Sequence, residues 1–233
     1  MANLLALWGM CPNCEAGRTA RDLVVSNEFW PHVLQVLLPF VVVALVIRTA
    51  SRHVDQGTTK SNDATSRVSR RAPLVVAGLV LGVGLGGFLD GIVLHQILQW
   101  HNILSSVVPP TDLIAMKYNM VWDGLFHAVT WLTCALGVGL LFRAGRRQDA
   151  FWSGHLLVGA LLGGCGLFNF VEGISSHLAL GIHHVHPGDG QLAWDVSFVV
   201  LAGLGFMLVG YVTSRRGCLD PRLPGRAKPS RRT

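Results

Sequence analysis

Five long apolar stretches alternate with short polar segments along this chain. Runs of about twenty apolar residues with few charges are typical of helices that cross a membrane. A helix suits this setting because a segment in lipid must satisfy its own backbone hydrogen-bonding groups. The pattern predicts spans at residues 31–47, 73–100, 119–142, 154–180 and 194–212.

These spans predict an all-α fold, a polytopic membrane bundle of five transmembrane helices. A polar, Ser/Thr-rich segment separates the first span from the other four. The predicted organisation is an extracytoplasmic N-terminal segment (1–30), a first transmembrane helix (31–48), a cytoplasmic linker (49–72), a four-helix core (73–214) and a basic cytoplasmic tail (215–233).

Composition agrees with a membrane protein. Of the 233 residues, 51% are hydrophobic and only 14% are charged, whereas soluble domains carry about 25% charged residues. The net charge of +6 would suit a nucleic-acid partner, but the basic residues sit beside the apolar runs, as topology determinants do. We therefore expect a lipid bilayer as partner and no nucleic acid.

Lysine and arginine are distributed unevenly between the two sides of the predicted bundle. Segments 48–71, 143–147 and 215–232 are rich in basic residues, whereas the opposite side has only Arg18, Arg21 and Lys117. Basic residues favour the cytoplasmic side. The N-terminus is therefore predicted outside and the C-terminus in the cytoplasm.

A polar motif occurs twice: FLDGIVLHQILQWH at residues 88–101 and FVEGISSHLALGIH at residues 170–183. The dipeptide Trp122-Asp123 in the third span likewise matches Trp194-Asp195 in the fifth. Spans two and three therefore form a unit that spans four and five repeat in the same orientation, a parallel internal repeat. The matching pairs are Phe88 and Phe170, Asp90 and Glu172, Gly91 and Gly173, Ile92 and Ile174, His95 and His177, and His101 and His183.

Glycines recur at small-xxx-small spacing in two spans, a pattern that lets helix backbones approach closely. They are Gly78, Gly82 and Gly86 in the second span, and Gly159 and Gly163 in the fourth. This spacing predicts a tightly packed four-helix core.

Ionisable side chains inside the spans predict a metal site. With 1.5 Å of rise per residue, His95 lies roughly 7 Å and Asp123 roughly 6 Å below the outer surface. The repeat places His177 and Asp195 at matching depths. The predicted ligands are therefore His95, Asp123, His177 and Asp195, since ionisable groups within spans are costly and usually functional.

Four further polar residues, Asp90, His127, Asn169 and Glu172, form a deeper layer. On an ideal helix Asp90 is rotated roughly 140° from His95, so one face cannot present both to one point. Either the layers are distinct or Gly91 and Gly173 mark local distortions. We favour distinct layers, in which the deeper residues orient ligands or relay protons.

Two histidines and two carboxylates suit zinc, iron, manganese or copper(II). A haem ligated by His95 and His177 is a less natural alternative, because carboxylates surround the two histidines. In a further alternative the Asp and His side chains only pair with each other and stabilise the bundle. The histidines that follow the spans, His101, His183, His184 and His186, form a predicted route by which metal reaches the site. The role of Cys11 and Cys14, and the oligomeric state, stay open.

The segments GLGGFLDGIVLHQILQWHNILS, WDGLFH and FNFVEGISSHLALGIHH resemble a family of bacterial predicted membrane proteins that is classed as domain of unknown function 2243. The resemblance covers residues 73–215. It implies a protein of the bacterial plasma (inner) membrane with four core helices, and it implies no activity.

The sequence thus predicts an integral membrane metal-binding protein with an outward-facing His/carboxylate site. It would handle a transition metal or use one as a membrane metalloenzyme. A bis-His haem redox protein and a proton- or ion-coupled transporter are the alternatives. The inner halves of the spans lack a chain of strongly polar residues, which disfavours the transporter.

Overall fold

The structure, a computed structural model, describes residues 12–26, 28–57 and 70–219. Cys11 and most of the predicted linker and tail lie outside this part. Apart from an isolated bridge between Arg70 and Ala150, regular structure in the described residues is helical. The helices are α2 (Pro12–Val24), α3 (Phe29–Gly57), α4 (Ala72–Asp90), α5 (Leu113–Gly145), α6 (Gly154–Glu172), α7 (Gln191–Phe198) and α8 (Phe206–Leu219), with π-helices η1 (Gly91–Ile97), η2 (Gly173–Ala179) and η3 (Val199–Gly205).

Five helices are long and apolar enough to cross a membrane, which confirms the predicted all-α membrane bundle. They comprise α3, α4 with η1, α5, α6 with η2, and α7 with η3 and α8. Two of their ends differ from the prediction. Helix α3 continues to Gly57, beyond the expected start of the linker at residue 49. Helix α5 begins at Leu113 because Asp112 caps it, accepting hydrogen bonds from the N–H groups of Ile114 and Ala115.

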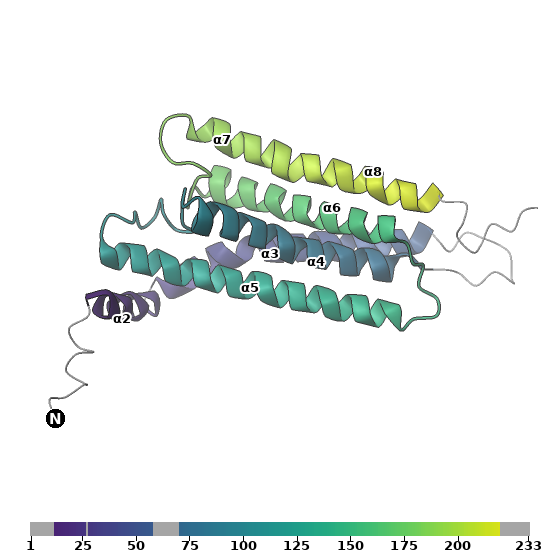
Figure 1. The fold of residues 1–233 in the computed structure, drawn as a ribbon, viewed down its shortest axis with the longest axis horizontal. Coiled ribbons are helices and arrows are strands. Elements are labelled where there is room, and N and C mark those ends of the chain that lie inside the picture. Colours follow the sequence, from purple (N-terminus) through teal and green to yellow (C-terminus); the bar gives the residue numbers. More distant parts are fainter. Residues whose placement is uncertain (1–11, 27, 58–69, 220–233) are drawn as a thin grey trace, which may run out of the picture.

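The helices lie side by side along one long axis (Figure 1). Helix α4 packs between α5 and α6, α6 packs on α8, and α3 covers α4 and α6 from one face. Helix α2, which hydropathy did not reveal, packs against α5. We call the end of the bundle that carries residues 98–112 and 180–190 the loop end.

Close backbone contact between α4 and α6 depends on glycine. A Cβ atom on Gly82 would collide with the carbonyl oxygen of Leu161, and one on Gly164 with that of Leu79. A Cβ on Gly163 would instead meet only the end of the Leu79 side chain, at 3.7 Å. The predicted tight packing is therefore present, but its closest contact in α6 is at Gly164, not at Gly163.

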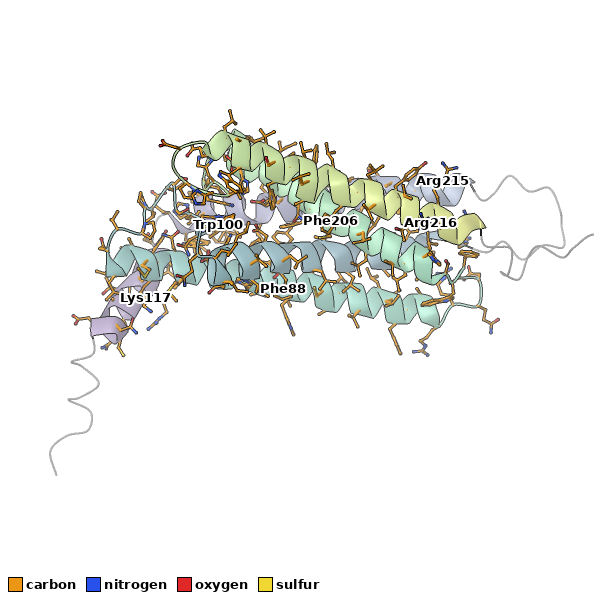
Figure 2. All side chains as sticks on the ribbon, turned by 45° about the horizontal axis from the view of Figure 1, so that its top comes forward. Phe88, Trp100, Lys117, Phe206, Arg215 and Arg216 are labelled. Atoms are coloured by element: carbon orange, nitrogen blue, oxygen red, sulfur yellow. The ribbon has the colours of Figure 1, made fainter. Side chains whose placement is uncertain are left out.

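The two ends of the bundle differ in charge. Lys117 and Trp100 lie at the loop end, and Arg215 and Arg216 lie at the opposite end (Figure 2). At that opposite end the Arg70 N–H donates to the Asp149 carbonyl oxygen at 2.7 Å, which joins the start of α4 to the α5–α6 connection.

Candidate metal centre

Two of the π-helices, η1 and η2, begin at the glycine of the repeated motif. In a π-helix the N–H bonds to the carbonyl five residues earlier, as Leu98 N–H does to Val93 at 2.8 Å and Leu180 N–H does to Ser175 at 2.9 Å. Residues five apart therefore lie above one another. This local change of helical winding places an acidic residue directly beneath each histidine.

In each motif the acidic residue is consequently in contact with the histidine five positions later. Nε2 of His95 lies 3.5 Å from Oδ2 of Asp90, and Nε2 of His177 lies 3.3 Å from Oε1 of Glu172. Of the two arrangements that the sequence allowed, the structure shows local distortions at Gly91 and Gly173. Asp90 and Glu172 therefore face the histidines directly and do not form a separate, deeper layer.

After η1 and after η2 the chain turns back over the bundle. The turn uses a left-handed residue, Gln99 (φ 51°) in one segment and Gly181 (φ 58°) in the other. Gln99 is the one non-glycine residue with positive φ in the described part of the chain, a conformation that non-glycine residues rarely adopt. The turns carry His101 and His183 into the bundle beside His95 and His177.

The two returning segments bind one another reciprocally. Nδ1 of His101 donates to the carbonyl oxygen of Val185 at 2.9 Å, and Nδ1 of His183 donates to that of Ile103 at 3.0 Å. The two rings stack with centroids 4.8 Å apart. Each bond fixes the ring and directs Nε2 inward, as a second partner does for metal-ligating histidines.

Asp123 and Asp195 hold these segments in place. Asp123 accepts hydrogen bonds from Ile103 N–H (2.9 Å) and from the Asn102 amide (2.6 Å). Its Oδ1 also lies 3.1 Å from Nδ1 of His95. Asp123 thus contacts the Nδ1 side of the histidine, the side away from Asp90.

Asp195 occupies the equivalent position in the second motif. It accepts from Val185 N–H at 2.9 Å and pairs with Nδ1 of His184 at 2.7 Å. Nδ1 of His177 lies 3.7 Å from its Oδ1. Both aspartates therefore lie where they orient a histidine and a loop.

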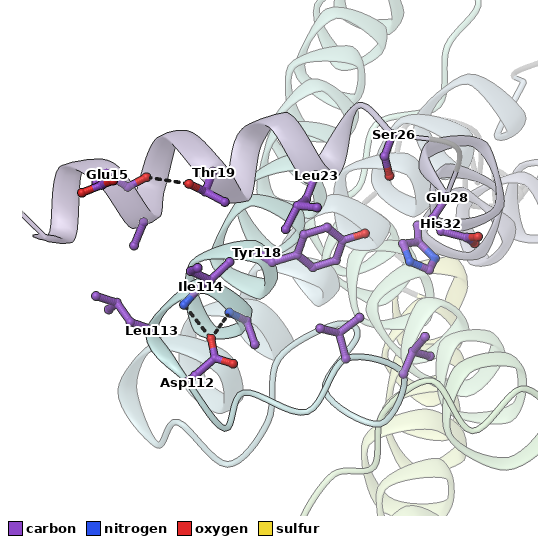
Figure 3. Close-up of a pocket in the computed structure, with 14 residues that line it drawn as sticks. Glu15, Thr19, Leu23, Ser26, Glu28, His32, Asp112, Leu113, Ile114 and Tyr118 are labelled. Atoms are coloured by element: carbon purple, nitrogen blue, oxygen red, sulfur yellow. Dashed lines mark hydrogen bonds between the residues drawn. The ribbon is translucent and has the colours of Figure 1, made fainter.

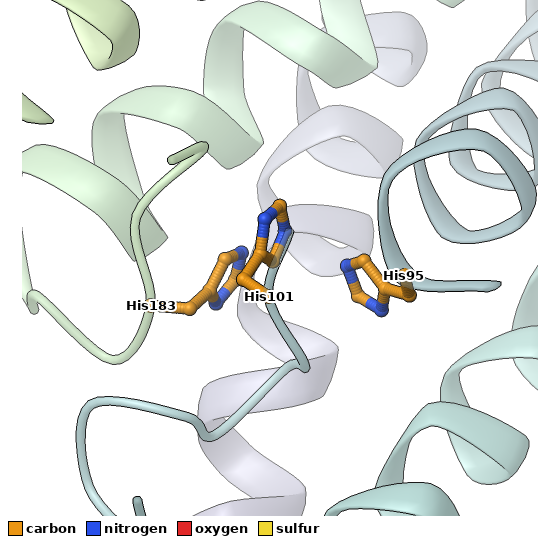
Figure 4. A group of neighbouring side chains, drawn as sticks. All are labelled: His95, His101 and His183. Carbon is orange, nitrogen blue, oxygen red and sulfur yellow. The ribbon is translucent and has the colours of Figure 1, made fainter. Parts of the chain in front are cut away.

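The result is a cluster of four imidazoles and two carboxylates. Ring centroids are 4.5 Å apart for His95 and His101 and 4.6 Å for His177 and His183. Figure 4 shows His95, His101 and His183 converging from three separate segments. We call this set the histidine cluster: Asp90, His95, His101, Glu172, His177 and His183.

Among the described residues, the inward atoms of the histidine cluster form no well-aligned hydrogen bond, although Nε2 of His183 lies 3.1 Å from Oε1 of Glu172. They are Nε2 of the four histidines and both carboxylate oxygens of Asp90 and Glu172. All six side chains are buried, with His183 fully so. Buried polar atoms normally form hydrogen bonds, so this concentration of polar atoms without well-aligned hydrogen bonds is unusual.

Two sets of these donors are close enough to hold a metal ion. One is His95, His101 and His183, and the other is Glu172, His177 and His183, with ligand atoms within 4.8 Å of one another in each set. Burial lowers the pKa of His183, and burial with neighbouring imidazoles lowers the pKa of His101 well below its usual value. Both rings are thus neutral at pH 7, the form that binds metals.

The remaining predicted site residues lie outside the histidine cluster. Nδ1 of His127 bonds to the Asp123 carbonyl oxygen at 2.7 Å, and the ring lies against Gly91. The Asn169 amide donates to the Ala202 carbonyl oxygen at 3.2 Å. His186 packs against Trp100 and Trp194.

The structure places each predicted histidine beside one predicted aspartate, but neither aspartate belongs to a donor set close enough to hold a metal ion. His95 and His177 face Asp90 and Glu172 through Nε2, while Asp123 and Asp195 lie on the Nδ1 side. His101 and His183, predicted as a route for metal, are part of the cluster itself. The sequence carried a signal for this, because both belong to the same repeated motif as His95 and His177.

A separate cavity of about 880 Å³ opens beside α2 at the loop end (Figure 3). Its lining includes Glu15, Glu28 and Asp112, together with His32 and Tyr118. The His32 ring contacts those of Tyr118 and Trp122. No residue of the histidine cluster lines this cavity.

These observations define a multi-pass α-helical membrane protein with a buried His/carboxylate cluster near one end. Residues 77–217 match the family described as predicted membrane protein (DUF2243). The chain belongs to this family, as the repeated motif suggested. No curated protein and no solved structure matches the chain.

Proposed function

We propose that this protein is a metal-binding membrane protein that holds a divalent transition metal in the histidine cluster. The observation that carries the proposal is the set of buried donor atoms that face one another from two equivalent motifs and form no well-aligned hydrogen bond. Imidazole nitrogen and carboxylate oxygen suit zinc, iron, manganese and copper(II). The covered position of the donors favours a resident metal over one that exchanges rapidly.

The electrostatics of the site support this proposal. Asp90, Asp123, Glu172 and Asp195 are all buried, and each of them forms an ion pair with at least one histidine. Histidines bind a metal in their neutral form. A bound cation would then supply the positive charge that buried carboxylates require.

The geometry favours a metal ion over haem. A haem between His95 and His177 would need the space between their rings, where it would be ligated from both sides. His101 and His183 occupy that space, since the centroid of each lies within 6.0 Å of the centroids of both His95 and His177. The porphyrin plane would have to displace both of these rings.

The distribution of polar groups disfavours an ion pathway across the membrane. The buried histidines and carboxylates of the described chain are His32, Asp90, His95, His101, Asp123, Glu172, His177, His183 and Asp195. All lie in the half of the bundle nearer the loop end. A coupled transporter would need such groups in the other half as well.

Elemental analysis of the purified wild-type protein, together with its absorption spectrum, tests this function. We expect a first-row transition metal at a molar ratio of one or more per chain, and no haem absorption. A protein that is folded but holds no metal, even after incubation with zinc, iron, manganese and copper salts, would exclude the proposal.

The contacts of Asp123 predict that it orients donors and does not bind the metal. Asp123→Asn removes the charge and keeps the shape, so we expect the metal to bind 10–100-fold more weakly at unchanged stoichiometry. Equilibrium dialysis against a metal buffer measures both quantities. A loss of stoichiometry as complete as that of a His101 variant would instead make Asp123 a ligand.

We also propose that the loop end faces the exterior of the bacterial plasma membrane. Arg52, Arg71, Arg143, Arg146 and Arg216 flank the spans at the opposite end, as cytoplasmic segments require. In a background without native cysteines, an impermeant maleimide should label Gly188→Cys but not Gln148→Cys in intact cells. Both positions are exposed. Gly188 also has a positive φ, a conformation that a cysteine there would have to adopt. Labelling of Gln148→Cys alone would show that the loop end faces the cytoplasm.

A further inference from the structure

The histidine cluster is divided between two places. The donor set with His95 and His101 contains neither His177 nor Glu172, and the set with His177 and Glu172 contains neither His95 nor His101. Ligands of one first-row metal ion, each about 2.0–2.2 Å from it, lie within about 4.4 Å of one another. One ion therefore cannot bind all six side chains as they stand.

Each motif contributes two histidines and one carboxylate. The first supplies Asp90, His95 and His101, and the second supplies Glu172, His177 and His183. In the structure the three side chains of the second motif form one close donor set, whereas His183 completes the other set with His95 and His101. Asp90 lies beside this other set, with its Oδ2 3.5 Å from Nε2 of His95. The two sets adjoin, because the His101 and His183 rings stack at 4.8 Å.

We propose that the histidine cluster is a dinuclear centre that binds two divalent first-row metal ions, one at each close donor set. This inference rests on the proposed metal-binding function and specifies its stoichiometry. His183 belongs to both close donor sets, so it lies at the junction of the two positions. In paired metal sites the ions are ~3.5–4 Å apart.

The single variants His95→Ala and His177→Ala separate the two positions. Each removes one donor from one set and leaves the three side chains of the other. Wild-type protein, stripped of metal and titrated with Mn²⁺, should bind two ions per chain. Each single variant should bind one ion.

Electron paramagnetic resonance of the same samples provides an independent signature. Two Mn²⁺ ions at this separation are coupled, so the loaded wild type should lack the hyperfine spectrum of an isolated ion. Each single variant should show that spectrum. Circular dichroism and gel filtration in detergent establish that the variants remain folded.

The outcomes are distinguishable. Two coupled ions in the wild type and one isolated ion in each variant support the dinuclear centre. One ion per wild-type chain refutes this inference and leaves the proposed metal-binding function standing. No bound ion refutes both, and two ions that persist in both variants place the metal outside the histidine cluster.

Discussion

Purified protein carrying His101→Ala and His183→Ala together is expected to contain no stoichiometric metal. The two side chains supply the stacked imidazoles at the centre of the histidine cluster, and His183 belongs to both close donor sets. Without them, each half keeps only one histidine and one carboxylate. Two donors are too few for a stable site, since protein sites for these metals use three or four ligands.

This double variant also distinguishes the observed cluster from the ligand set that the sequence suggested. His95, Asp123, His177 and Asp195 all remain in the variant, so a site made of those four would keep its metal. The matched control is His155→Ala with His186→Ala, which also removes two histidines but none from the cluster. The control should retain the wild-type metal content, as measured by mass spectrometry of purified, folded protein.

Gly164→Ala is expected to prevent stable packing of the bundle. The added methyl group would collide with the backbone of Leu79 at its carbonyl carbon and oxygen, and two helix backbones would have to separate. Overpacking a well-packed interior costs ~1–3 kcal/mol and occasionally more. We expect at least the upper end of this range here, because backbone cannot rotate away as a side chain can.

Gly163→Ala is the matched control, one residue earlier in the same helix. Its methyl group would meet only a side-chain carbon of Leu79 at 3.7 Å, an ordinary contact. Alanine is also favoured over glycine within a helix by ~0.5–1 kcal/mol. Gel filtration after heating in detergent should therefore show a lowered melting temperature for Gly164→Ala alone. Equal stability of the two variants would contradict the packing described.

Hydropathy was sufficient to predict the membrane helices, because an apolar run long enough to span a bilayer has few alternatives. The end of α3 and the start of α5 were missed for a different reason. Polar residues can continue a helix beyond the membrane, and a cap such as Asp112 acts through local hydrogen bonds that hydropathy does not report. Helix α2 was missed because it is amphipathic and short.

The candidate site was only partly predictable. Pairing of His95 with Asp123 followed from matching depths, and the structure places them 3.1 Å apart. The contact between Asp90 and His95 did not follow, because an ideal α-helix separates them by roughly 140°. Only the π-helix from Gly91 brings them together.

The position of His101 and His183 depends on chain reversal. A histidine after the end of a span is naturally expected to lie in a surface loop. The left-handed conformation at Gln99 and Gly181 instead turns the chain back, and the reciprocal bonds to Val185 and Ile103 hold both rings inside. Neither the left-handed turn nor the reciprocal hydrogen bonds can be predicted from hydropathy, although the repeated motif does include both histidines.

X-ray absorption spectroscopy at the edge of the bound metal tests the central claim most directly, because it reports the ligands of the metal itself. The histidine cluster predicts a first shell of nitrogen and oxygen at about 2.0–2.2 Å, with the outer-shell scattering that imidazole rings produce. That imidazole scattering should be weaker in whatever metal remains with the His101→Ala, His183→Ala variant, which keeps only His95 and His177 of the four imidazoles. A first shell of sulfur, or a metal without imidazole scattering in the wild type, would contradict the account.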